Sequence, residues 1–299
     1  MPTPARQPED GIFPFGRPNR PRPWAWDGSG TPEQLAIGVY PSALHVRWDP
    51  PPNVSLAEGA AGRISSLAVD VEPTVFWDGN DATARVVEWK QQVGFVDGDD
   101  GHGTLMLGLN GPSGRGLDSD YFPALPATRE RTAFLDVYPV FLVKHGSKSH
   151  PGQGLVMKRE YDAIAEKLPP GTYGRFTRAS LPVRPSARRL PTLAVDRFGA
   201  WLRNALLELA PAHVVTLGQE PWTTLGLLRG VTLAHPAESL SDSRTSGYGR
   251  TGHLTIAGHR MAWTPLAHPG LIRHASTKDP DGWCTVHQEW LGRDRDSRT

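Results

Sequence analysis

The chain of 299 residues contains 32 Lys or Arg and 31 Asp or Glu, which gives a formal net charge of +1. This balance argues against a nucleic-acid binder that is basic throughout, but it allows a local basic face. The single cysteine, Cys284, excludes an internal disulfide and a zinc site made of cysteines alone.

Residues 1–30 predict an N-terminal extension, because their composition does not support regular hydrogen-bonded structure. The segment holds seven prolines together with Arg17, Arg20 and Arg22. Four aromatic residues suggest that it packs onto the rest of the chain: Phe13, Phe15, Trp24 and Trp26. We expect residues 31–299 to form a single α/β domain after this extension.

Apolar runs and apolar spacing predict the elements of that domain. Five runs predict buried strands, at residues 35–39, 67–71, 133–138, 214–218 and 261–266. Helical spacing is found over residues 81–92 and 198–209, and the glycine-rich stretch 94–116 predicts an active-site loop. Strands that alternate with helices indicate a three-layer αβα fold with a central, mainly parallel sheet.

No apolar run approaches the roughly 18 residues of a membrane helix, and the N-terminus has no apolar signal-peptide core. We therefore expect a cytoplasmic protein without membrane contact. His253 and His259 flank a hairpin signal at Ala257 and Gly258, without the spacing of metal ligands on a helix. The sequence predicts no metal or cofactor, and it suggests no obligatory protein partner.

Polar side chains lie at or just after the ends of the predicted strands. They are Tyr40, Asp70 with Glu72, Asp136, Gln219 with Glu220, and His268. The carboxyl ends of parallel strands meet at one edge of a sheet, so we expect these side chains to converge on one site. Trp48 and Trp222 are placed after strands where they could stack on a base. Residues 173–203 add seven arginines against one acid, a candidate grip for phosphate.

Short motifs at these strand ends resemble those of the uracil-DNA glycosylase superfamily, over roughly residues 34–290. Gly38-Val39-Tyr40-Pro41-Ser42 resembles the family's first motif, which carries the water-activating side chain. Residues 67–73 resemble the family's strand that supplies a wall of the base pocket. Residues 134–137 resemble the strand whose side chain reads the base edge. Leu266-Ala267-His268-Pro269-Gly270 resembles the motif whose histidine supports the leaving base.

The resemblance implies a metal-free DNA glycosylase that flips a base out of the duplex and cleaves its N-glycosidic bond. It implies that His268 stabilises the leaving base and that Asp70 or Glu72 orients water or steadies the sugar cation. Tyr40, Val69 and Asp136 are expected to line the base pocket. DNA contacts are expected from the two motif loops and nearby arginines: Ser42, Pro269, Gly270, Arg175, Arg178 and Arg273.

Three positions depart from the family pattern. Tyr40 replaces an Asp or Asn, so another acid is expected to activate the water. Val69 replaces a stacking Phe and leaves room for a larger base. Asp136 replaces the base-reading Asn; an ionised carboxylate only accepts hydrogen bonds, and its natural partner is the amino group of cytosine.

These departures predict a modified cytosine as the base removed, since excision of plain cytosine would be ruinous. Enlarged cytosines occur in phage genomes, so phage defence is a coherent setting. A uracil-DNA glycosylase of base excision repair is an alternative. The loss of the usual acid at Tyr40 also allows a catalytically silent protein that binds modified DNA. An unrelated α/β hydrolase or transferase with similar strand ends is a third possibility.

Overall fold

A computed structural model describes residues 10–54, 63–144, 153–170, 178–275 and 282–296. Its main element is a six-stranded sheet in the order β5-β1-β6-β9-β8-β7. The first four strands run parallel: β5 (Thr132–Asp136), β1 (Gln34–Gly38), β6 (His213–Leu217) and β9 (His259–Leu266). Two antiparallel strands complete it, β8 (Gly252–Ile256) and β7 (Val231–Ala234). The prediction of a mixed α/β fold with a central, mostly parallel sheet is confirmed.

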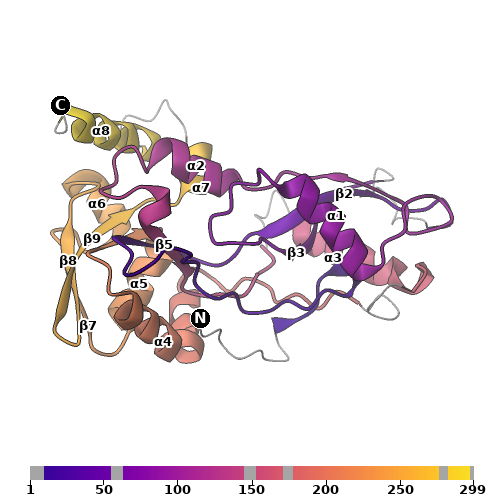
Figure 1. Cartoon of the computed structure of the whole chain (residues 1–299), viewed down its shortest axis with the longest axis horizontal. Helices are drawn as coiled ribbons and strands as arrows, with labels where there is room; N and C mark the ends of the chain where they lie inside the picture. The colour runs from indigo at the N-terminus through magenta and orange to yellow at the C-terminus, as the bar shows by residue number, and fades with distance from the viewer. Residues whose placement is uncertain (1–9, 55–62, 145–152, 171–177, 276–281, 297–299) are drawn as a thin grey trace.

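Helices flank this sheet on both sides. On one side lie α2 (Pro112–Asp120), α7 (Pro269–His274) and α8 (Trp283–Asp296), and on the other α4 (Leu190–Leu209) and α5 (Gln219–Leu227), as Figure 1 shows. The short helix α6 (Leu240–Ser246) precedes β8. None of the helices in the described ranges has the length and apolar character needed to cross a membrane.

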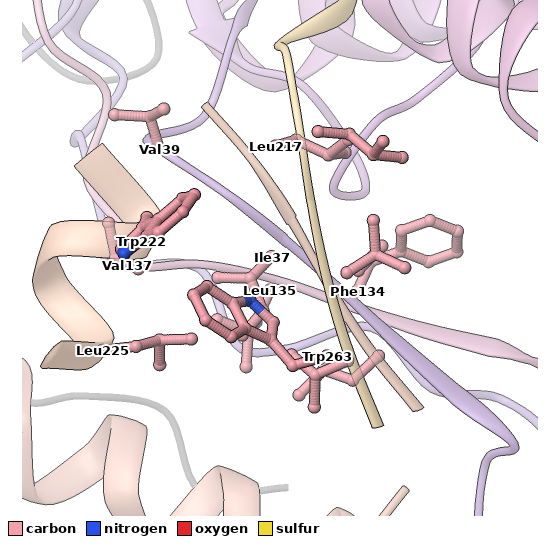
Figure 2. Close-up of a cluster of buried hydrophobic side chains, with 14 of the residues drawn as sticks. Ile37, Val39, Phe134, Leu135, Val137, Leu217, Trp222, Leu225 and Trp263 are labelled. Carbon is pink, nitrogen blue, oxygen red and sulfur yellow. The ribbon is translucent and has the colours of Figure 1, made fainter. Parts of the chain in front are cut away.

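The main core forms because strands β1, β5 and β6 are buried along their whole length and pack against apolar helix faces. Figure 2 shows Ile37, Leu135 and Trp263 in this core, beside Leu225 of α5. Trp222 belongs to the same cluster; it is 8% exposed, and its ring lies 4.9 Å from that of Trp263. The prediction that Trp222 stacks on a base is therefore wrong.

A second, antiparallel sheet has the order β3-β2-β4. Its strands are β2 (Ala43–Asp49), β3 (Ile64–Val71) and β4 (Thr104–Leu107), and α1 (Ala82–Val93) and α3 (Gln153–Ile164) lie beside it (Figure 1). Residues 67–71 are thus a strand, but the prediction that they belong to the parallel sheet is wrong. Strand β4 and helix α2 also form within or at the end of the stretch 94–116, which was predicted to be a loop.

Strand β2 begins a few residues after β1, in a segment for which the sequence predicts no helix or strand. Its residues alternate between inward and outward faces, and Leu44, Val46 and Trp48 are buried while Arg47 is exposed. Trp48 is fully buried in the second core, where its Nε1 donates to the carbonyl of His102 at 2.8 Å. It is therefore not placed to stack on a base.

Residues 10–26 pack against both sheets. Phe15 is fully buried, with its ring 5.2 Å from that of Trp48 and 5.5 Å from that of Tyr161, and its backbone N–H donates to the Tyr161 hydroxyl. Ala25 and Phe134 exchange two backbone hydrogen bonds at the β5 edge of the main sheet. This segment therefore contacts both sheets, and Pro14 within it lines the cavity between them.

Candidate active site

A cavity of about 1340 Å³ lies where the carboxyl ends of β1, β5, β6 and β9 face the second sheet. Seven of the predicted site residues line it: Tyr40, Ser42, Glu72, Asp136, His268, Gly270 and Arg273. The structure thus brings together residues from four separate parts of the chain. Main-sheet strand ends supply most of these groups, because parallel strands deliver their carboxyl ends to one edge.

Other predicted site residues lie elsewhere. Val69 is fully buried in the second core and does not line the cavity, so it is not a wall of a base pocket there. Asp70 is also absent from the lining, and its Oδ2 accepts from Arg17 Nε at 2.8 Å. Pro269 is a buried residue at the start of α7, and Arg178 is exposed outside the cavity lining. Arg175 lies outside the described residues.

One buried arginine holds two of the carboxylates that line the cavity, those of Glu72 and Asp136. Arg22 Nη2 lies 2.7 Å from Asp136 Oδ2 and 3.1 Å from Glu72 Oε1, while Arg22 Nη1 donates to the Glu72 carbonyl at 3.0 Å. The backbone N–H of Ser42 also donates to Glu72 Oε1, at 3.1 Å. Arg22 and both acids are at most 6% exposed. We call Arg22, Glu72 and Asp136 the carboxylate clamp.

The carboxylate clamp sets the protonation of its two acids. Burial raises the pKa of Glu72 to about 7; the charge of Arg22 opposes this shift and that of Asp136 adds to it. Burial also raises the pKa of Asp136, while Arg22 lowers it. A carboxyl that titrates near neutral pH is suited to act as a general base. Sequence reasoning missed Arg22, because no spacing connects a proline-rich segment with acids 50 and 114 residues later.

Gly38, at the end of β1, leaves room for the Asp136 carboxylate. A Cβ at this position would collide with Asp136 Oδ1 and come within 3.1 Å of the Phe76 ring. We expect Gly38→Ala to lower the free energy of unfolding by about 1–3 kcal/mol, because Arg22 fixes the carboxylate that would have to move. Urea unfolding measures this effect, with Gly116→Ala, which meets no atom closer than 3.4 Å, as the control. Equal losses in the two variants would contradict this reading.

His268 follows β9 and caps α7. Its Nδ1 accepts a hydrogen bond from the backbone N–H of Gly270 at 3.0 Å. Burial, aided by the charges of Lys144 and Arg184, lowers the pKa of His268 to about 4. The imidazole is therefore neutral at physiological pH, and because Nδ1 accepts, its single proton is on Nε2. His268 thus offers a fixed Nε2–H donor at the cavity.

Two buried phenols hold the peptide just before His268. The Tyr121 hydroxyl donates to the Ala267 carbonyl at 2.7 Å, and the Ala267 N–H donates to the Tyr248 oxygen at 3.0 Å. Tyr248 and His287 Nδ1 are 2.9 Å apart, and His287 Nε2 is 2.8 Å from the Asp120 carbonyl. Since the carbonyl can only accept, His287 carries its proton on Nε2, and Tyr248 donates to Nδ1. This chain of bonds fixes the backbone that presents His268.

Phe76 supplies an aromatic face to the cavity. Its φ of 53° is in the left-handed region, which is uncommon for a bulky residue and marks local backbone strain. Arg129 Nη2 donates to the Phe76 carbonyl, and the Phe76 ring lies 6.0 Å from that of His268. Sequence reasoning missed Phe76, since it lies in the irregular segment after β3.

Tyr40 lies beside a paired arginine and acid. Arg184 Nη2 donates to Glu220 Oε1, and the guanidinium carbon lies 5.6 Å from the centre of the Tyr40 ring. Burial raises the pKa of Tyr40 to about 12, against the charge of Arg184. The phenol is therefore neutral at physiological pH and cannot take a proton from water. Of the acids near the sequence motifs, Glu72 is the one that lines the cavity with a pKa near neutrality.

Within the described ranges, no group of three or more His, Cys, Asp or Glu is arranged to hold a metal ion. No protein-family model matches the chain, and no curated protein is significantly similar to it.

Proposed function

We propose that this protein is a DNA glycosylase, of the kind found in the uracil-DNA glycosylase superfamily, that hydrolyses the N-glycosidic bond of a modified cytosine. One observation carries the proposal: a neutral His268 with its proton on Nε2 lines the same cavity as a buried carboxylate pair with raised pKa values. This reaction needs a hydrogen-bond donor for the leaving base and a carboxylate that can accept a proton from water.

In the proposed reaction, the bond between the sugar C1′ and the base nitrogen breaks, and its electron pair leaves on the base. His268 Nε2–H donates to the base oxygen on which negative charge develops. The oxygen of a water molecule bonds to C1′, and Glu72 accepts the proton that this water loses. The products are the free base and an abasic site.

Base recognition is assigned to Asp136 and Phe76. Asp136 is an acceptor while it is paired with Arg22, which suits the exocyclic amino group of cytosine. The Phe76 ring offers an apolar face for a flipped base, and this role replaces the one that the sequence suggested for Val69. The cavity, at about 1340 Å³, has room for a base enlarged by modification.

The test is a cleavage assay on synthetic DNA. Single- and double-stranded oligonucleotides carry one cytosine, one uracil, or one cytosine enlarged at C5, and alkali then cuts the strand at any abasic site. We expect cutting only at modified cytosine. Cutting only at uracil would favour the repair alternative. No cutting on any of these substrates would overturn the enzyme proposal, and binding without product would favour the silent DNA-binding alternative.

Asp136→Asn is expected to shift base preference toward uracil, because an amide can both donate and accept a hydrogen bond. One base-edge pairing discriminates by about 1–3 kcal/mol, so the ratio of kcat/KM for modified cytosine to that for uracil should fall by roughly 5- to 150-fold. The matched control is Asp70→Asn, which removes a carboxylate that does not line the cavity. An unchanged ratio in Asp136→Asn would remove Asp136 from base recognition.

A further inference from the structure

Two cationic side chains, Lys144 and Arg184, lie next to each other at the cavity wall. The Val143 N–H donates to the Pro182 carbonyl, and the Arg184 N–H donates to the Val143 carbonyl, both at 2.9 Å. These bonds form a parallel bridge between Val143 and Val183, so the residues that follow, Lys144 and Arg184, are neighbours. Both line the cavity that also holds His268.

Arg184 is held in position before any ligand arrives. Glu220 accepts from one end of its guanidinium, and the guanidinium carbon lies 5.6 Å from the centre of the Tyr40 ring. Its Nε is buried and has no acceptor among the described residues.

Lys144 is exposed to the cavity, and within the described ranges no carboxylate lies at ion-pair distance from it. The acids that could have neutralised it are engaged, because Glu72 and Asp136 bind Arg22 and Glu220 binds Arg184. The surrounding protein and the charge of Arg184 lower the pKa of Lys144. The charges of Lys144 and Arg184 also act on His268, so all three groups lie within electrostatic reach of one another. An anion at this place would relieve the repulsion between the two cations.

We propose that Lys144 and Arg184 form a binding site for one phosphate group, that of the phosphodiester next to the nucleotide in the cavity. The inference rests on the proposed function for the nature of that nucleotide. Arg184 would contribute the fixed planar donor and Lys144 the mobile point charge, and the two together match the several oxygens of a phosphate. The cavity, at about 1340 Å³, has room for a base and an adjoining phosphate together.

The experiment measures how binding of a short single-stranded oligodeoxynucleotide, without any modified base, depends on salt. Each phosphate contact to a single strand contributes about 0.7 to the slope of log K against log salt. We expect Lys144→Gln to reduce this slope by about 0.7, and Lys144→Arg to restore it. Lys167→Gln is the control, since Lys167 is exposed and does not line the cavity.

An equal slope in the wild type and in Lys144→Gln would overturn the proposal, and so would undetectable binding by the wild type at low salt. Inorganic phosphate, compared with chloride at matched ionic strength, distinguishes the source of the ligand. If millimolar phosphate displaces the oligonucleotide from the wild type but not from Lys144→Gln, the ligand of this site is free phosphate and not a phosphodiester. The binding measurement involves no turnover, so its result stands even if the cleavage assay fails. If the protein cleaves DNA but Lys144→Gln has the same salt slope as the wild type, only the phosphate-site proposal is rejected.

Discussion

Replacing Arg22 with Gln is expected to lower the free energy of unfolding at pH 8 by about 3–5 kcal/mol, the usual effect of breaking a buried ion pair by removing one partner. The reason is the carboxylate clamp. Glu72 and Asp136 are at most 5% exposed, and Arg22 is the cation that both contact. Without it, two desolvated like charges face each other, and at least one of them must take up a proton.

The effect of Arg22→Gln on the free energy of unfolding should depend on pH, because Glu72 titrates near neutrality. The pKa of Glu72 is about 7 in the folded state, against the ordinary glutamate value of 4.5 that applies to the unfolded chain. The folded state therefore binds this proton more tightly, and the stability that Glu72 contributes is greatest below about pH 4.5 and is lost as the pH rises to about 7. In Arg22→Gln the pKa of Glu72 rises further, so the loss of stability continues above pH 7.

Urea unfolding between pH 5 and pH 9 checks the prediction. The difference between the wild type and Arg22→Gln should be smallest at pH 5 and should grow with pH. Arg85→Gln is the control, because Arg85 pairs with Asp81 and Glu88 with its side chain 43% exposed, and such a pair contributes less than about 1 kcal/mol. A loss in Arg22→Gln that is the same at every pH would mean that Arg22 acts through packing alone.

His268→Ala is expected to lower kcat on modified cytosine by about 10²–10³, the usual effect of removing one donor to a developing anion. KM should change little, since the bond to the base oxygen strengthens only as the base leaves. His259→Ala, which changes an exposed histidine at the start of β9, is the matched control. A fall in kcat of less than about tenfold would be too small for such a donor.

The pH profile of kcat separates the roles of His268 and Glu72. The pKa of His268 is about 4, so this residue should impose no change between pH 5 and pH 8. The rate should rise with pH as the Glu72 carboxyl ionises, reaching half of its maximum near pH 7 and a plateau above about pH 8. Glu72→Gln should remove that rise. A decline of the rate above pH 6.5 that His268→Ala abolishes would instead indicate a protonated imidazolium.

The sequence was sufficient to predict the parallel sheet, because its buried strands are continuous apolar runs bounded by turns. It also predicted that Tyr40, Asp136 and His268 converge, since parallel strands bring their carboxyl ends to one edge. Glu72 reaches the same cavity from the end of the antiparallel strand β3, which that rule does not cover. Strand β2 was missed although its alternation of Leu44, Val46 and Trp48 with polar residues is typical of a half-buried strand. Strand β3 was predicted as a strand but assigned to the wrong sheet, because an apolar run does not specify its partners.

The remaining site residues depend on tertiary contacts that no local pattern encodes. Phe76 reaches the cavity through a left-handed backbone conformation that sequence rules would assign to glycine. Arg22 reaches Asp136 from a segment whose composition indicates only an absence of regular structure. Lys144 and Arg184 become neighbours through a single β-bridge between two irregular segments.

The N-terminal segment also bears on how this protein reaches its native state. Phe15 bonds to Tyr161, Arg22 to Asp136 and Asp10 to Arg197, across separations of 146, 114 and 187 residues. Contacts of such separation form late, because closing long loops costs chain entropy before the contacts are made. A segment that docks last is commonly among the first to open, and its opening would separate Arg22 from both carboxylates without breaking any strand pairing of the parallel sheet. Hydrogen exchange at Phe15 and Ala25 would then report the loss of an ordered site well before global unfolding.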